Sequence, residues 1–214
     1  MSDGLATDDD FIIKEKSTAF WDMVAQDYCS RVLQGWDGKD WICEVCKSMF
    51  PEDQPLRILD VGAGSGYVSA YLSKMGHDVT ATDTSEEMLN QIIKLAAMEN
   101  LDLQIIKDDI MNTNLHKASY DAIVMIDVLF CLPDVRKALH NCIDLLHPGG
   151  LLVILDGNYL LHLYSDEYSS RDAFYQMKNG RKESAEMLHL TEEEFLELSK
   201  IFGNSRINST KRPK

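Results

Sequence analysis

Three glycines at alternate positions follow an apolar segment in the first third of the chain. Gly62, Gly64 and Gly66 belong to the stretch VGAGSG, directly after ILD. Because glycine has no Cβ, such a turn can pass close beneath a ligand and adopt positive φ angles. Asp83 stands 21 residues after Gly62, and an acid at this spacing can accept hydrogen bonds from both hydroxyls of a ribose. The turn and the acid together predict a site for a nucleoside-containing ligand.

Strand and helix patterns alternate around this turn. Short apolar runs predict strands, and amphipathic stretches between them predict helices. The predicted strands are residues 56–61, 77–82, 103–107, 121–126 and 151–155. The predicted helices are residues 66–75, a helix that begins at residue 84, and residues 133–145. This order indicates an α/β fold, a doubly wound and mostly parallel sheet with helices on both faces, in which ligands bind beyond the carboxyl ends of the strands.

The helix after Asp83 carries its own start signal. Thr84 is predicted as its N-cap, and Glu87 three residues later completes a capping box. The predicted apolar face of this helix consists of Met88, Leu89, Ile92, Ile93 and Ala96.

Two further helices are predicted before the first strand. One covers residues 14–34, because apolar side chains recur there at four-residue steps. Those side chains are Phe20, Val24, Tyr28 and Val32. The second covers residues 39–50 and ends at the two prolines of FPEDQP.

The composition is that of a globular protein and narrows the range of partners. Hydrophobic residues make up 45% of the chain, yet no apolar run approaches the ~20 residues that a membrane span needs. The formal net charge of -14 disfavours nucleic acid as a partner, because like charges repel. The acidic N-terminus lacks the apolar segment of a secretory signal. We therefore expect a cytoplasmic protein with no membrane attachment.

Two of the five cysteines form a CxxC pair. Cys43 and Cys46 lie in a stretch with a helical pattern, and no second pair follows at metal-ligand spacing. We therefore expect two reduced cysteines on a helix rather than a redox centre, and we predict no metal site.

A nicotinamide dinucleotide is the alternative ligand for such a turn. Its fingerprint is G-x-G-x-x-G, whereas the glycines here run G-x-G-x-G, with Asp60 two residues before Gly62. A dinucleotide fold also needs a second mononucleotide-binding half, for which too few residues follow residue 156. An NAD-dependent oxidoreductase is therefore the runner-up among enzymes.

Several stretches, in order, resemble the motifs of one enzyme family. They are LDVGAGSG, TATD, IIKDDIMNTNLHKASYDAIVMIDVLFCLPD and LLHPGGLLVILD. Together they resemble the class I S-adenosylmethionine-dependent methyltransferases of the small-molecule type, over residues 18–156 and more weakly over 189–212. The resemblance implies a Rossmann-like fold, S-adenosylmethionine as the cofactor and S-adenosylhomocysteine as the product. It also implies that the methyl group moves to a small-molecule acceptor by in-line displacement.

The resemblance implies roles for the residues around the glycine turn. Asp60 would orient the turn and reach the amino group of the cofactor through water. Asp83, with Thr84 beside it, would bind the ribose. The methionine part of the cofactor would be lined by Gly62, Ala63 and Gly64.

Three residues further along the chain match positions of the same family. Asp109, rather than Asp108, would contact the adenine amine, and the backbone N–H of Ile110 would lie on the adenine ring. Asp127 would face the methionine or the transferred methyl group, although a polar residue that merely ends a strand is the alternative interpretation.

The resemblance also suggests how the single domain is organised. Its parts are an N-terminal helical lid (1–55), the S-adenosylmethionine-binding core (56–156), an insertion that covers the substrate (157–190) and a C-terminal helix and strand (191–214). In the lid, Trp21 and Tyr28 would fold over the cofactor, and a plain amphipathic helix with buried aromatic rings is the competing interpretation.

The sequence identifies no catalytic residue. A sulfonium methyl group is already activated, so the protein mainly has to position the nucleophile and exclude water. A general base would help if the acceptor is a hydroxyl or a thiol, and the candidates are His162, His189 and Asp127. For either histidine, a surface or packing role is the ordinary alternative.

The C-terminal end departs from the family pattern. The family's sheet usually ends in an antiparallel hairpin, whereas this chain stops at RINSTKRPK, where that hairpin would turn back. We therefore expect a shortened hairpin whose sheet edge is shielded by a homodimer partner or by residues 157–190. The same departure motivates a second functional class, a non-catalytic cofactor-binding or assembly protein.

Overall fold

The computed structural model describes residues 8–33, 40–51 and 53–156. The chain divides into two compact units at Leu155, and all the elements below belong to the first unit. The predicted substrate-covering insertion and the predicted C-terminal helix and strand lie outside the described residues.

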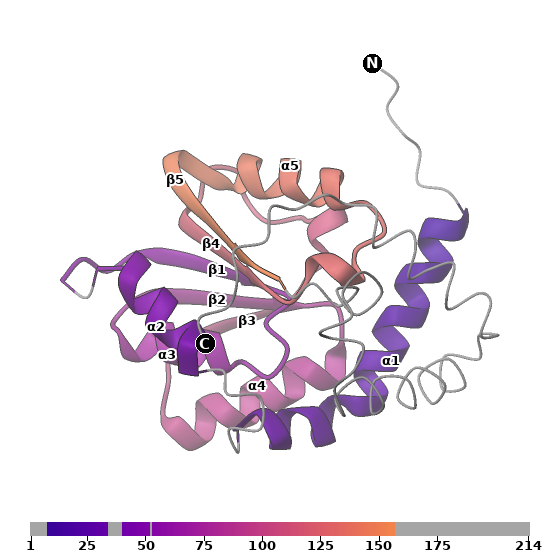
Figure 1. The fold of residues 1–214 in the computed structure, drawn as a ribbon, viewed down its shortest axis with the longest axis horizontal. Helices are drawn as coiled ribbons and strands as arrows, with labels where there is room; N and C mark the ends of the chain where they lie inside the picture. Colours follow the sequence, from indigo (N-terminus) through magenta and orange to yellow (C-terminus); the bar gives the residue numbers. More distant parts are fainter. Residues whose placement is uncertain (1–7, 34–39, 52, 157–214) are drawn as a thin grey trace, which may run out of the picture. The chain divides into compact units, whose positions relative to one another are not determined.

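Five parallel strands form the centre of the described unit. They are β1 (Arg57–Val61), β2 (Asp78–Asp83), β3 (Leu103–Lys107), β4 (Tyr120–Ile126) and β5 (Leu146–Leu155). Their order in the sheet is β3-β2-β1-β4-β5 (Figure 1). The strand order therefore reverses between β1 and β4, and at such a reversal the carboxyl ends of parallel strands leave a crevice for ligands.

Helices cover both faces of the sheet, as the sequence predicted. They are α1 (Asp8–Leu33), α2 (Asp40–Met49), α3 (Tyr67–Lys74), α4 (Glu86–Glu99) and α5 (Val135–Leu145), with short 3-10 turns η1 (Ile110–Asn112) and η2 (Leu129–Cys131). Successive residues of a strand point to opposite faces. Accordingly, Leu59 of β1 packs in the cluster with α5, whereas its neighbour Ile58 packs with α2 and α3.

The N-terminal helix is longer than predicted and buries a different stripe. It begins at Asp8 rather than at residue 14. Of the four residues predicted for its apolar face, only Val32 is buried, and the buried line continues through Ala25 and Cys29. Residues at strict four-residue steps drift around a helix of 3.6 residues per turn, so they do not share one face.

The start of α4 also differs from the prediction. Its N-cap is Ser85, whose hydroxyl oxygen accepts a hydrogen bond from the Met88 N–H at 3.1 Å. Thr84 instead accepts a hydrogen bond from the hydroxyl of Thr18. The predicted capping box does not form, because the third residue after the true cap is a methionine. On the apolar face, Ile93 is 52% exposed and Leu95 is buried in its place.

The cysteine pair lies on a helix, as predicted. Cys43 and Cys46 are free cysteines, both buried in α2. Among the residues that the structure describes, no helix is long and apolar enough to cross a membrane.

Candidate active site

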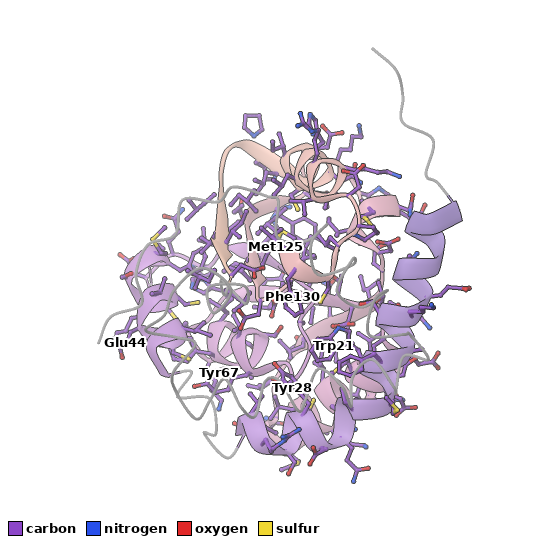
Figure 2. The ribbon with its side chains drawn as sticks, turned by 45° about the vertical axis from the view of Figure 1, so that its right-hand side comes forward. Trp21, Tyr28, Glu44, Tyr67, Met125 and Phe130 are labelled. Atoms are coloured by element: carbon purple, nitrogen blue, oxygen red, sulfur yellow. The ribbon has the colours of Figure 1, made fainter. Side chains whose placement is uncertain are left out.

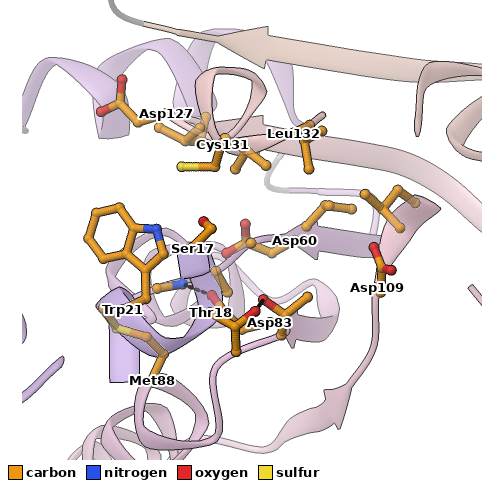
Figure 3. A pocket seen from close by; sticks show the side chains of 18 of the residues that line it. Ser17, Thr18, Trp21, Asp60, Asp83, Met88, Asp109, Asp127, Cys131 and Leu132 are labelled. Atoms are coloured by element: carbon orange, nitrogen blue, oxygen red, sulfur yellow. Dashed lines mark hydrogen bonds between the residues drawn. The ribbon is translucent and has the colours of Figure 1, made fainter. Parts of the chain in front are cut away.

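A pocket opens beyond the carboxyl ends of β1 and β4. Its walls come from the glycine turn, the ends of β2, β3 and β4, the η2 turn and helix α1. In Figure 3, Cys131 and Leu132 lie on one side of this space, and Thr18 and Asp83 lie on the opposite side. The pocket brings together all the predicted cofactor-binding residues, namely Trp21, Tyr28, Asp60, Gly62, Ala63, Gly64, Asp83, Thr84, Asp109, Ile110 and Asp127.

The glycine turn has the backbone conformation that its sequence predicts. Gly62, Gly64 and Gly66 all have positive φ angles, of 65°, 52° and 73°. The reason for glycine differs from the expected one at Gly62, where an added Cβ would lie 2.7 Å from Cγ2 of Val128. The protein's own η2 segment, and not only a ligand, therefore requires the missing side chain.

Asp83 joins this turn to the start of α4. One carboxylate oxygen accepts a hydrogen bond from the Gly64 N–H at 3.0 Å, and the other accepts one from the Ser85 N–H at 2.9 Å. Burial raises the pKa of the Asp83 carboxyl group, and these backbone N–H groups offset part of that effect. A carboxylate offers about four acceptor positions, more than the backbone N–H groups of Gly64, Thr84 and Ser85 can fill, so a ligand in the pocket can donate to the same carboxylate.

Asp60 is the most buried acid of the pocket. It is 2% exposed, and it accepts a hydrogen bond of 2.5 Å from the hydroxyl of Ser69 on α3. Burial raises the pKa of Asp60 to about 7, although the Ser69 hydrogen bond opposes the rise. A positively charged ligand group nearby would favour the ionised carboxylate.

Asp109 is held in place at the end of β3. Its carboxylate accepts hydrogen bonds from the Met111 N–H at 3.0 Å and from the Asn112 amide at 2.9 Å. It also forms an ion pair of 2.6 Å with Lys14 of α1. Burial tends to raise the pKa of Asp109, but the hydrogen bonds from Lys14, Asn112 and Met111 outweigh it and hold the pKa below its ordinary value.

Two aromatic rings from α1 reach the pocket. Trp21 and Tyr28 lie edge to face, with ring centroids 5.5 Å apart at an angle of 69°. Both point from α1 toward the rest of the unit (Figure 2). An added Cβ on Gly64 would lie 4.0 Å from the Tyr28 ring, so this ring covers the glycine turn.

Asp127 follows β4 in an unusual backbone conformation. Its φ angle is 55°, and its N–H donates a hydrogen bond of 2.7 Å to the Leu155 carbonyl. Aspartate is one of the few residues besides glycine that adopt this left-handed conformation. The hydrogen bond to Leu155 holds the Asp127 backbone there, and Asp127 is among the residues that line the pocket (Figure 3).

The sequence interpretation missed several lining residues, three of them on α1. They are Lys14, Ser17, Thr18, Met88, Asp108, Met111, Cys131 and Leu132. The residues on α1 could have been predicted from the sequence, because Lys14, Thr18 and Trp21 are spaced so that they lie on one face of a helix. Of the base candidates, Asp127 lines the pocket, whereas His162 and His189 lie outside the described residues. Within the described ranges, no cluster of three or more acidic, cysteine or histidine side chains could hold a metal ion.

Comparisons with known proteins agree with this geometry. Residues 59–154 match the family described as "Methyltransferase domain". The ubiquinone biosynthesis O-methyltransferase of Coxiella burnetii (strain Dugway 5J108-111) is 28% identical over 137 residues, which are 63% of this chain and 58% of that protein. The protein of the same name from Rickettsia bellii (strain OSU 85-389) is 28% identical over 134 residues, 60% of this chain and 55% of the relative.

Solved structures show the same fold. A protein from Methanococcus maripaludis, assigned as an S-adenosyl-L-methionine-dependent methyltransferase, superposes with a TM-score of 0.60 at 22% identity, covering 89% of this chain and 86% of that one. A SAM-dependent methyltransferase from Aquifex aeolicus superposes with a TM-score of 0.50 at 23% identity, covering 60% and 79%. At these identities the likeness establishes the fold alone.

The strand order, the glycine turn with its paired acid and the family match lead to one assignment. Over residues 59–154, the chain is similar to the class I S-adenosylmethionine-dependent methyltransferases. It spans 58% and 55% of the length of the two curated relatives named above.

Proposed function

We propose that this protein binds S-adenosylmethionine and transfers its methyl group to a small-molecule acceptor, with S-adenosylhomocysteine as the product. The observation that carries the proposal is the pairing of Asp83 with the Gly64 N–H, which sets an acid against the glycine turn inside a pocket. Relatives named as methyltransferases favour this function over the two alternatives, hydride transfer and non-catalytic binding.

The residues of the pocket fit the cofactor at both ends. The free lone pairs of Asp83 suit the two ribose hydroxyls, and the buried carboxyl group of Asp60 suits an ammonium group. Asp109 and Ile110 would hold the adenine at the other end. When bound, the cofactor supplies a methyl group that its sulfonium charge has already activated.

The chain's own contribution is then position and the exclusion of water. Tyr28 of α1 lies over the glycine turn, and Trp21 packs edge to face against Tyr28. Such closure by apolar rings strengthens the charged contacts inside the pocket. Asp127 at the rim is the described candidate for holding or accepting a proton from the acceptor.

We propose a hydroxyl group on a small, partly apolar molecule as the acceptor. The curated relatives are named for O-methylation in ubiquinone biosynthesis. The rim beside Asp127 carries apolar side chains, including Val128 and Leu132. Apolar walls with a few polar groups are typical of sites for small molecules.

Replacement of Asp83 tests the proposal. Asp83→Ala is expected to weaken S-adenosylhomocysteine binding by about 1–3 kcal/mol, the cost of leaving buried polar groups unpaired, as measured by isothermal titration calorimetry. Asp78→Ala is the matched control, because Asp78 is an exposed residue at the opposite end of the same strand. Equal affinity of wild type and Asp83→Ala would contradict the ribose role, and no binding by the wild type would contradict the cofactor.

We also propose that a second copy of the chain covers one edge of the sheet. Among the described strands, β5 pairs with β4 alone, so its other edge is open to pairing. Sedimentation velocity should then show a dimer, and a monomer at micromolar concentration would contradict this proposal. The expected cytoplasmic location and the expected lack of nucleic-acid binding both stay predictions.

A further inference from the structure

Helix α1 does more than place aromatic rings over the pocket. Three of its polar side chains contact the segments that hold the predicted adenosine-binding acids. Lys14 pairs with Asp109, and Thr18 donates a hydrogen bond to Thr84. The third contact, made by Asp22, involves a buried partner and two hydrogen bonds.

Asp22 caps the start of α4 from a different helix. One of its carboxylate oxygens accepts a hydrogen bond of 2.6 Å from the Ser85 hydroxyl and one of 3.2 Å from the Glu87 N–H. Ser85 itself caps the Met88 N–H. Two of the unpaired N–H groups at this helix start are therefore satisfied, one by the local cap and one by α1.

Ser85 connects this cap to Asp83. Its N–H donates to one oxygen of the Asp83 carboxylate, and its hydroxyl donates to Asp22. The Ser85 side chain is 0% exposed, so no bulk water can replace the acceptor that Asp22 supplies. Loss of Asp22 would leave the O–H donor of this buried hydroxyl without an acceptor, at a cost that the segment can avoid only by shifting.

We propose that Asp22 is a positioning residue for cofactor binding, which acts through Ser85 on the orientation of the Asp83 carboxylate. This inference rests on the proposed function. It makes the docking of α1 and the grip on the ribose one linked event, because the same serine takes part in both.

A double-mutant cycle separates this role from a merely structural one. S-adenosylhomocysteine affinity is measured by calorimetry for wild type, Asp22→Ala, Asp83→Ala and the double variant. Asp22→Ala is expected to weaken binding roughly tenfold, because one hydrogen bond to a charged group is lost. In the Asp83→Ala background the same substitution is expected to have little effect.

Three further variants control for charge and folding. Asp22→Asn keeps an acceptor oxygen and should restore most of the affinity. Asp22→Glu keeps the charge but displaces the oxygens, so it should bind weakly, and it serves as the second variant if Asp22→Ala folds poorly. Asp27→Ala lies on the same helix, where Asp27 is 75% exposed and paired with Arg31, and it should bind like wild type.

Amide hydrogen exchange gives a readout that does not need turnover. The Glu87 and Met88 amides should exchange faster in Asp22→Ala than in wild type. Wild-type affinity in Asp22→Ala, or effects that multiply in the double variant, would overturn the inference and leave the proposed function standing. A wild type that binds no S-adenosylhomocysteine would overturn both.

Discussion

Asp60 is the most buried of the five described aspartates that line the pocket. Its hydrogen bond from Ser69 comes from α3, the helix that follows the glycine turn. A carboxyl group in such surroundings ionises with difficulty, and burial raises its pKa to about 7. Its charge therefore changes within the pH range in which the protein can be assayed.

Cofactor affinity should depend on pH through this residue. The proposed contact with an ammonium group needs the ionised carboxylate, so affinity should rise as the pH rises through about 7. Below that value the loss approaches about tenfold per pH unit, because each unit costs about 1.4 kcal/mol. The effect is measured by binding titrations with S-adenosylmethionine at about pH 6.0 and about pH 7.5, one value on each side of the Asp60 pKa of about 7.

Asp60→Asn is the control for this prediction. The amide keeps the size of the side chain and cannot ionise, so the variant should bind more weakly at neutral pH and lose most of the pH dependence. The same pH dependence in wild type and variant would assign the titration to another group.

The sequence predicted the acidic residues that the core contributes to the pocket, but not the polar residues of α1 that pair with this part of the molecule. Asp83 was predicted from its spacing after the glycine turn, and Asp60 and Asp109 were predicted from the family motifs that they match. Lys14 and Asp22 were not predicted, because their partners lie 95 and 63 positions away along the chain. Only the packing of α1 against α4 brings such pairs together.

At the scale of elements, the glycine turn requires glycine for two separate reasons, its backbone conformation and the lack of space for a side chain. Gly62 has a positive φ angle, and an added Cβ would also collide with Val128. Gly76, in the turn before β2, has a positive φ angle of 93°, but an added Cβ would meet nothing within 4 Å. Substitution of Gly76 therefore tests backbone strain alone, whereas substitution of Gly62 tests backbone strain and steric conflict together.

Gly76→Ala should lower the free energy of unfolding by about 1–2 kcal/mol, the cost of a left-handed residue with a side chain. Gly62→Ala should lower it by about 1–3 kcal/mol more, because overpacking adds to the strain. Urea unfolding followed by circular dichroism measures both. Equal losses would mean that the η2 segment moves aside without cost.

The corrections to α1 and α4 share one cause. Periodicity predicted that both helices exist and nearly where α1 ends, because apolar spacing is a local property. It misjudged which residues face inward, since Ile93 is exposed and Leu95 is buried. The inward face of a helix depends on the neighbours it packs against, and α4 packs against α1 and also against β2 and β3.

At the scale of the whole molecule, one buried histidine links the stability of the fold to pH. His77 is 4% exposed and accepts a hydrogen bond from the Leu56 N–H through Nδ1. Among the described residues, no side chain or backbone group pairs with its Nε2. Burial disfavours the charged ring and lowers the pKa of His77 from 6.5.

This shift predicts a loss of stability in acid. Below pH 6.5 the unfolded chain takes up a proton at His77 that the folded chain does not, so the free energy of unfolding falls as the pH falls. The slope from one proton is at most about 1.4 kcal/mol per pH unit. The effect ends once the pH drops below the lowered pKa.

Buried acids have the opposite effect on the pH dependence of stability. The contribution of His77 must therefore be separated from theirs by comparing a His77 variant with wild type. The raised pKa values of Asp60 and Asp83 mean that these groups favour the folded state as the pH falls. We expect His77→Phe to gain stability relative to wild type as the pH is lowered, measured by urea unfolding. His116→Gln, at an exposed position, should show no such gain. The prediction is contradicted if the free energy of unfolding differs between His77→Phe and wild type by the same amount at every pH.

The sequence by itself determined the alternation of strands and helices, the position of the glycine turn and the acids that end the strands around it. These features are local, because chain direction and apolar period follow from neighbouring residues. Only the tertiary structure decided that α1 caps α4, that Val128 occupies the space above Gly62, and that Ser85 joins Asp22 to Asp83. Those contacts join residues far apart in the chain, and their free energy exists only after the sheet has brought the elements together.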